Sequence, residues 1–304
     1  MADIIHGATG AQGSPVLSAL TAAGRTAIAA VRHPETVPDG IAAQQVDLAS
    51  VDSLVSTYEG ADGVFVHLPM GAPEVATAQA RAIVEAVTRA RPGRVVISTS
   101  GQIVDQPDSP LQAPADSPIM TLIDGATGSG VPTAVVASRL YLENLLLPVI
   151  LAPMREEGVL RYPLPASFPV SWSSHLDVTD VVARLLTDAS VTGTVAVGHR
   201  PGLTGQDLAA AFSTHLGYEV RYEGITPEAF GELITPLFGP AAAPVVDLYR
   251  TLNEQDGNII GEDNSAQVLL GLAPRPVESW LAALSIQESP TAVTVSEKSS
   301  TPHI

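Results

Sequence analysis

The stretch that most constrains the fold of this chain is a glycine-rich loop near its start. A short apolar run, Asp3–His6, leads into Gly7-Ala8-Thr9-Gly10-Ala11-Gln12-Gly13, and a helix-like segment follows. Three glycines at this spacing suit a tight turn, a close backbone approach to a pyrophosphate, and close packing of helix on strand. The N-terminus of the helix then presents free N–H groups and a partial positive charge to phosphate. The order strand, loop, helix therefore predicts a dinucleotide-binding unit.

The end of the second apolar run indicates which dinucleotide binds. The run Ala27–Val31 ends at Arg32, 19 residues after Gly13. The adenosine ribose lies at about this place in a dinucleotide fold, and an acidic residue there accepts a hydrogen bond from a free 2′-hydroxyl. Arginine instead offers a planar set of donors that fits a 2′-phosphate. We therefore predict NADP(H) in preference to NAD(H); the alternative is that Arg32 caps a strand end or pairs with a carboxylate.

Composition excludes several classes of site. The chain has 304 residues, 45% of them apolar, and no cysteine, so disulfides, thiolate metal sites and cysteine nucleophiles are excluded. No His/carboxylate spacing indicates a metal site. A net charge of −17 disfavours nucleic acid and anionic membrane as partners. We expect no basic, cleavable leader, because Asp3–His6 already reads as a strand. We expect a cytoplasmic monomer or homodimer that acts on a small-molecule substrate.

Apolar runs alternate with helical patterns through the first half of the chain, which is typical of a parallel, doubly wound sheet. The predicted strands are Asp3–His6, Ala27–Val31, Gln44–Asp47, Gly63–His67, Arg94–Ser98 and Thr133–Ala137. The predicted helices are Ser14–Ala23, Ser50–Tyr58, Val75–Ala90 and Pro118–Ser129. The fold class is therefore α/β, with a Rossmann-like sheet.

Ligands of such sheets bind beyond the carboxyl ends of the strands, so the residues there are candidates for cofactor binding. Asp47 is placed beside the adenine, with a helix N-cap as the equal alternative. His67 and Leu68 follow the fourth strand and are placed on the nicotinamide side. Ser98 and Ser100 offer hydroxyls to ribose or substrate, or else belong to a simple turn of small residues.

The second half is less regular, because several prolines interrupt it. We predict a Rossmann domain over residues 1–150 and a smaller, mainly helical substrate lobe over 151–285, which is allowed to return strands to the main sheet. Helices are expected at Asp177–Asp188, Gly205–Leu216, Pro227–Leu233, Ala241–Leu252, Ser265–Leu270 and Val277–Leu284, and a strand at Thr194–Val197. Residues 286–304 carry no apolar period and are predicted to be a disordered tail.

Three segments together resemble the NmrA-like family of atypical short-chain dehydrogenase/reductases, over roughly residues 3–284. They are Gly7–Gly13 with Arg32-His33-Pro34, Ser129–Thr133 leading to Arg139 and Tyr141–Asn144, and His175–Val182 with Pro201–Thr204. The chain looks like the NAD(P)H-dependent quinone reductases and NADPH sensors of that family. The resemblance implies a Rossmann domain with a small C-terminal lobe. It also implies cofactor contacts from Gly7, Thr9, Gly10, Gln12, Gly13 and Arg32.

The sequence departs from ordinary short-chain reductases at the catalytic pair. Those enzymes use Tyr-x-x-x-Lys, in which the lysine lowers the pKa of the tyrosine and holds the ribose. The only lysine here is Lys298, in the predicted tail. Related phenylpropanoid reductases carry a lysine at a place that falls near Ile119 by spacing from Ser129 and Gly130. Both of these standard proton donors are therefore missing.

Hydride transfer without a strong acid favours acceptors that need little help. A quinone, or an activated enone or ketone, takes hydride readily when it stacks on the nicotinamide in a water-poor pocket. Tyr141 and His175 remain as candidate proton donors, each with a packing or capping role as its alternative. Two rival functions stay open: a non-catalytic NADP(H)-binding redox sensor acting through a protein partner, and a tailoring isomerase or dehydratase.

Overall fold

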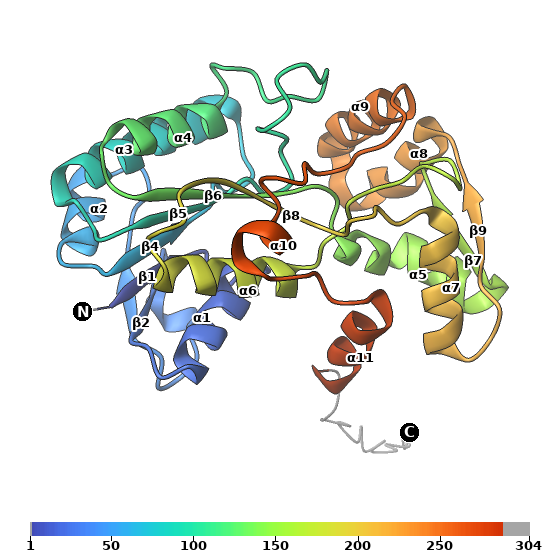
Figure 1. Cartoon of the computed structure of the whole chain (residues 1–304), viewed down its shortest axis with the longest axis horizontal. Helices are drawn as coiled ribbons and strands as arrows, with labels where there is room; N and C mark the ends of the chain where they lie inside the picture. Colours follow the sequence, from blue (N-terminus) through green and yellow to red (C-terminus); the bar gives the residue numbers. More distant parts are fainter. Residues whose placement is uncertain (1, 288–304) are drawn as a thin grey trace, which may run out of the picture.

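The computed structural model describes residues 2–287, and its larger part is a seven-stranded parallel sheet (Figure 1). The strand order is β3-β2-β1-β4-β5-β6-β8. The strands are β1 (Asp3–His6), β2 (Ala27–Val31), β3 (Ala43–Gln45), β4 (Gly63–Val66), β5 (Val95–Ser98), β6 (Thr133–Ser138) and β8 (Gly193–Val197). The order reverses between β1 and β4, so the sheet is doubly wound, and ligands bind at such a switch point.

Helices cover both faces of this sheet (Figure 1). One face carries α2 (Val51–Tyr58), α3 (Pro73–Ala90) and α4 (Pro118–Gly128), and the other carries α1 (Gly13–Ala22) and α6 (His175–Thr187). The strands are nearly all apolar and buried on both sides, as parallel strands between two helical layers require. Their carboxyl ends therefore form one continuous edge at which polar residues can gather.

Serine side chains define where several of these helices begin. Ser50 accepts a hydrogen bond from the backbone N–H of Ser53 at the start of α2, and Ser117 does the same for α4. Ser174 and Asp177 form a reciprocal capping box at the start of α6. This cap fixes the direction in which α6 leaves the carboxyl edge of the sheet, and hence the place of its first residue, His175.

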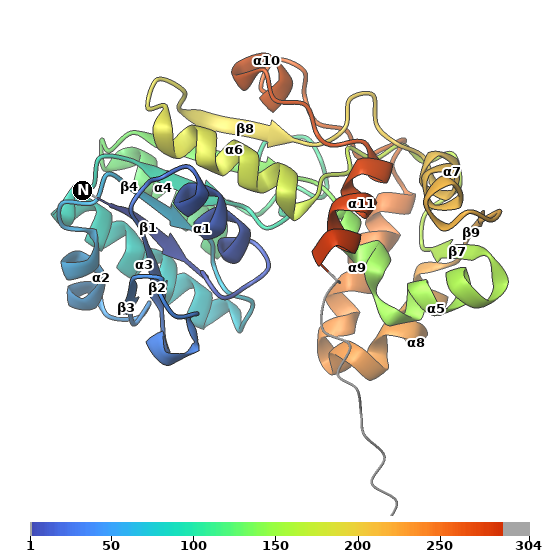
Figure 2. The ribbon, with the colours of Figure 1, turned by 90° about the horizontal axis from the view of Figure 1, so that it is seen from below.

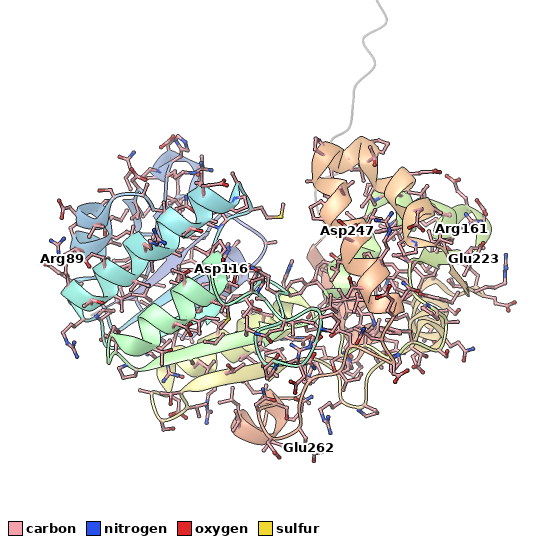
Figure 3. All side chains as sticks on the ribbon, turned by 90° about the horizontal axis from the view of Figure 1, so that it is seen from above. Arg89, Asp116, Arg161, Glu223, Asp247 and Glu262 are labelled. Carbon is pink, nitrogen blue, oxygen red and sulfur yellow. The ribbon has the colours of Figure 1, made fainter. Side chains whose placement is uncertain are left out.

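A second, smaller lobe lies beside the carboxyl edge of the sheet (Figure 2). It contains η2 (Leu142–Leu146), α5 (Pro148–Glu157), β7 (Val159–Tyr162), α7 (Gly205–Leu216), β9 (Arg221–Gly224), α8 (Pro227–Phe238), η3 (Gly239–Ala241), α9 (Ala242–Asn253) and α11 (Val277–Gln287). Strands β7 and β9 pair in parallel, and Arg161 and Glu223 form an ion pair across them at 3.0 Å (Figure 3). An aromatic cluster of Tyr162, Trp172, Phe230 and Tyr249 fills the core of this lobe. The two remaining short elements are η1 (Pro34–Thr36), after β2, and α10 (Ala266–Leu270), beside the edge strand β8.

Residues Pro227–Asn253 are long and apolar enough to cross a membrane by length and composition alone. The structure shows a bent pair of helices there, because η3 interrupts the segment between α8 and α9. The rings of Phe230 and Tyr249 lie 5.4 Å apart. A straight helix would separate residues 19 positions apart by about 28 Å. The segment therefore folds back on itself and packs its aromatic side into the lobe.

The predicted fold class is confirmed: the sheet is parallel, Rossmann-like and doubly wound, and the C-terminal region is mainly helical. Residues 175–197 return to the first lobe as α6 and β8, and β8 pairs with β6. Strands β7 and β9 and helix α5 were not foreseen. Prolines at 148 and 153 indicated broken structure there, but Pro148 begins α5 and Pro153 lies inside it. The predicted tail lies, apart from its first two residues, outside the described part of the chain.

Candidate active site

The glycine loop has the backbone shape that a phosphate-binding turn needs. Gly7 has φ +61°, a left-handed conformation that favours glycine, and a Cβ on Gly13 would overlap the carbonyl oxygen of Gly7. The loop closes on itself through hydrogen bonds from the N–H of Gly10 to the carbonyl of Gly7 and from Ser14 to Gly10. The N–H groups of Ala11 and Gln12 have no acceptor within the described residues. These free donors at the start of α1 fit a pyrophosphate.

A cleft of about 420 Å³ continues from this loop across the ends of β2, β3 and β4. Its lining residues include Gly7, Thr9, Gly10, Arg32, Asp47, Leu48, His67, Pro69 and Met70. Arg32 is exposed at the rim of this cleft and forms no ion pair with any residue that the structure describes. The alternative of a carboxylate partner for Arg32 therefore finds no support, and its guanidinium is available to a ligand.

Asp47 lies in the same cleft, but it does not cap a helix. Its Oδ1 accepts a hydrogen bond from the backbone N–H of Ala49 at 2.9 Å, in a turn that precedes α2, while Ser50 is the N-cap of that helix. The capping alternative for Asp47 is therefore wrong. The second carboxylate oxygen has no hydrogen-bond partner among residues 2–287, and it lies at the end of the cleft where the adenosine half of a dinucleotide would lie.

A row of polar side chains joins the glycine loop to the ends of β5 and β6. The Oγ of Ser98 donates to Oε1 of Gln12 at 2.6 Å, and Nε2 of Gln12 donates to Oγ of Ser100 at 3.1 Å. Ser100 is one of the few non-glycine residues with positive φ, at +53°. Ser98 and Gln12 thus bind each other, and their shared network holds the turn after β5 against the cofactor loop.

The hydroxyl of Tyr141 ends this network. It accepts a hydrogen bond from Oγ of Ser138 at 2.6 Å and is also bonded with Ser98. Burial raises the pKa of Tyr141 to about 12, although both serines oppose the shift. Tyr141 therefore keeps its proton throughout the working pH range, and no lysine stands among the described residues to change that.

His67 lies directly over the first glycine. A Cβ on Gly7 would overlap its Nε2, which is buried and has no hydrogen-bond partner in the described part of the chain. Burial lowers the pKa of His67, and it lowers that of the neighbouring His6 to about 3. His6 bonds through Nε2 to the hydroxyl of Tyr58 at 2.8 Å. Both rings are thus neutral at pH 7, and His67 presents a free polar atom to the cofactor loop.

His175 begins α6 next to Tyr141, with their ring centroids 4.6 Å apart. Burial lowers the pKa of His175, while the carboxylate of Glu143 opposes the shift. The two predicted proton donors therefore stand side by side at the carboxyl edge of the sheet. The sequence did not single out Ser138, Glu143 or Trp280, which lie at this site.

Other candidates from the sequence serve packing. Phe168 and Trp172, two aromatic residues of a proline-rich segment, are buried in the core of the second lobe. Ile119, at the place where related reductases carry lysine, is 1% exposed inside α4 and packs against the sheet. Among residues 2–287, no group of three or more His, Cys, Asp or Glu side chains is arranged to hold a metal ion.

Taken together, these residues fit a pyridine nucleotide laid across the carboxyl edge of the sheet. In such a pose the free N–H groups would face its pyrophosphate and Arg32 and Asp47 would lie at its adenosine end. The His67, Tyr141 and His175 side chains lie toward β4, β5 and β6. The orphaned Nε2 of His67 above the loop supports the same fit. Fold and site define a nucleotide-dependent oxidoreductase of the Rossmann class.

Comparison with known proteins identifies the family to which the chain belongs. The model of the NmrA-like family matches residues 4–281, and the chain belongs to that family. A curated relative, an NAD(P)H azoreductase of Xenophilus azovorans, is 29% identical over 249 residues, which are 78% of this chain and 82% of the relative. The protein is accordingly an NAD(P)H-dependent oxidoreductase of this family, similar in sequence to an azoreductase.

Two solved structures share the fold at low sequence identity. The Citrobacter sp. triphenylmethane reductase complexed with NADP(H) has a TM-score of 0.77 and 19% identity, over 93% of this chain and all of the other. The NADPH-dependent quinone oxidoreductase of Escherichia coli complexed with NADPH has a TM-score of 0.74 and 19% identity, over 94% of this chain and 100% of the other. Each of these alignments spans both lobes of this chain.

Proposed function

We propose that this protein uses NADPH in preference to NADH to reduce a small, flat, electron-poor acceptor, such as a quinone or an activated enone or ketone. The proposed class of acceptor rests on which side chains lie at the carboxyl edge of the sheet. Tyr141 is held between two serines with its pKa raised, and no described residue is a lysine. A site without a lysine-activated tyrosine suits acceptors that stabilise much of the negative charge themselves.

The coenzyme preference rests on Arg32. Its guanidinium is exposed at the rim of the cleft, without an ion-pair partner among the described residues, at the position where the adenosine ribose lies in this fold class. Arginine binds phosphate through several donors at once, whereas a ribose hydroxyl needs an acceptor. Two structural neighbours are complexes, one with NADP(H) and the other with NADPH, which agrees with the proposal.

The residues of the site bind and orient in this proposal. The N–H groups of Ala11 and Gln12 bind the pyrophosphate. The hydrogen bonds among Gln12, Ser98 and Ser100 hold the turn after β5 beside the glycine loop. NADPH, when bound, supplies the hydride. Tyr141 and His175 form one wall of the acceptor pocket, and the second lobe limits the access of water.

Oxidation of NADPH with a panel of acceptors tests the proposal. We expect turnover with benzoquinones, activated enones and the azo compounds that the curated relative's name suggests, and slow or no turnover with plain ketones and sugars. A Gly13→Val variant, in which the side chain overlaps the Gly7 carbonyl, serves as the binding-deficient control. Equal rates for sugars and quinones would refute the acceptor class. Tight coenzyme binding without oxidation by any acceptor would favour the redox sensor.

We further propose that the protein works in the cytoplasm, where the NADPH pool supplies its reductant, as a monomer or homodimer. A net charge of −17 supports a small molecule, rather than nucleic acid or an anionic membrane, as the partner. Light scattering of the purified chain tests the oligomeric state, and binding to DNA or anionic vesicles at moderate salt would contradict the partner assignment.

A further inference from the structure

The carboxylate of Glu143 joins three separate elements beside the proposed acceptor site. Its Oε1 accepts a hydrogen bond from the backbone N–H of His175 at 2.9 Å, where α6 begins. The same oxygen accepts a second bond, at 3.2 Å, from the indole N–H of Trp280 in α11. Glu143 itself lies in η2, two residues after Tyr141. The carboxylate is thus held in place from both sides.

The second oxygen of this carboxylate lacks a partner. Oε2 of Glu143 is buried and makes no hydrogen bond to any residue in the range 2–287. Buried carboxylate oxygens in native proteins are nearly always paired, because an unpaired one keeps much of its desolvation cost. The carboxylate also lies beside the His175 ring, since Nδ1 of His175 stands 3.9 Å from its other oxygen, Oε1. A movement of about 1 Å would bring this nitrogen to a normal hydrogen-bond distance.

The other nitrogen of the His175 ring is free for a ligand. Nε2 makes no hydrogen bond to a described residue. It is not one of the buried polar atoms that lack a partner, and 19% of the His175 side chain is exposed to solvent. A carboxylate beside one nitrogen of an imidazole fixes the tautomer and directs the opposite nitrogen to the reacting group. The ring lies beside that of Tyr141, with 52° between the two ring planes, and this close contact limits its rotation.

From this geometry we propose that Glu143, held by Trp280, is a positioning residue that orients His175 as the proton carrier of the reduction. The proposal rests on the function given above and adds the source of the proton. The acceptor carbon takes the hydride of NADPH, the acceptor oxygen takes the proton on Nε2 of the imidazolium, and the neutral ring recovers a proton from water. The products are reduced acceptor and NADP⁺.

The groups that face His175 come from several elements. Glu143 and Tyr141 lie on the side of η2, and His67 lies after β4 and opposes a positive charge on its neighbours. On α6 itself, Asp177 and Asp180 are both engaged by Arg275. Among the described residues, Glu143 is therefore the one carboxylate whose charge raises the pKa of the His175 ring. Burial of the ring lowers the same pKa.

The first test measures the titration midpoint of the His175 ring directly and does not require the protein to turn over an acceptor. The titration of His175 is followed by NMR, with its signal assigned from a His175→Gln spectrum. Glu143→Gln keeps an acceptor oxygen for Trp280 and for the backbone but removes the charge. We expect the midpoint of His175 to fall by about 1 pH unit. Asp180→Asn removes a carboxylate of the same helix that Arg275 already engages, and should leave the midpoint unchanged.

The second test compares two acceptors. An activated ketone needs a proton as the hydride arrives, whereas a quinone releases a stabilised phenolate. We expect Glu143→Gln to lower kcat/KM for the ketone about 10-fold or more and to leave the quinone nearly unaffected. Trp280→Phe, which removes only the N–H donor, should act in the same direction by a smaller factor.

An unchanged His175 midpoint in Glu143→Gln, or equal losses with both acceptors, would overturn the assignment and leave Glu143 a structural tether. If neither acceptor is reduced by the wild-type protein, the proposed function fails, and the NMR titration still decides whether Glu143 acts on His175.

Discussion

The ring of His67 lies so close to Gly7 that a methyl group on residue 7 would overlap Nε2. The first residue after β1 and the first residue after β4 thus depend on each other, although 60 positions separate them. Gly7 also has φ +61°, so two separate constraints exclude a side chain there. Both residues line the cleft in which the coenzyme is expected to lie.

A Gly7→Ala variant separates these constraints. Left-handed backbone costs about 1–2 kcal/mol for a residue with a side chain, and the overlap with His67 adds to it. We expect Gly7→Ala to lower the free energy of unfolding in urea by more than the backbone cost alone. The double variant Gly7→Ala/His67→Ala should return to about that cost, since the overlap is gone. Equal stabilities for the single and the double variant would show that the ring yields freely.

Arg32 determines the coenzyme preference in our proposal, and its replacement should act on one coenzyme only. A hydrogen bond to a charged group contributes about 1.5–3 kcal/mol, so Arg32→Gln should weaken NADPH binding about 10- to 100-fold. NADH affinity should stay the same. Calorimetry measures both. Arg89→Gln is the matched control, because Arg89 lies on α3 at the edge of the first lobe away from the second, paired with Asp52 (Figure 3). A parallel loss for both coenzymes would refute the role of Arg32.

The glycine loop and the order of the sheet could be predicted because their signals are local. Gly7, Gly10 and Gly13 stand within seven positions, and each strand of the first lobe is a short apolar run. Strand ends could be placed at one edge from the parallel topology alone. Asp47 shows the limit of this reasoning: its place at the edge was foreseen, but only the structure shows that Ser50 is the cap and that Asp47 faces the cleft.

Contacts between distant segments left no signal in one sequence. Glu143 and Trp280 are 137 positions apart, and nothing in the residues around either of them indicates the other. Strands β7 and β9 are four residues each and pair across 58 intervening residues, so neither shows a long alternating pattern. Their pairing depends on the packing of the second lobe, which a local pattern does not describe.

Burial of His6 predicts a loss of stability in acid. The pKa of the folded state lies near 3, and the unfolded ring has a pKa near 6.5. Above pH 6.5 the ring is neutral in both states. Between pH 6.5 and 3, only the unfolded state binds the proton, so the free energy of unfolding falls as the pH falls, by up to about 5 kcal/mol.

The double variant His6→Leu/Tyr58→Phe tests this origin, because it removes the ring together with its hydrogen-bond partner. Urea unfolding at several pH values should show a shallower acid slope for the variant than for the wild type. His67 and His175 also have lowered pKa values and keep part of the slope. Identical slopes would mean that His6 is protonated without cost in the folded protein.

The ion pair of Arg139 with Asp105 supplies a last prediction. The two side chains are 0% and 7% exposed and meet at 2.8 Å, and Asp105 also accepts a bond from Asn264. Asp105 belongs to the connection between β5 and α4, so the pair ties this connection to the end of β6.

Removal of one partner leaves a buried charge without compensation, and Asp105→Asn should therefore destabilise the protein by about 3–5 kcal/mol. Replacement of both by apolar residues of similar size, Asp105→Leu/Arg139→Met, should recover most of that loss. Urea denaturation of the wild type and the two variants distinguishes the cases: a double variant as unstable as the single one would show that the charges, and not the filled space, hold the connection in place.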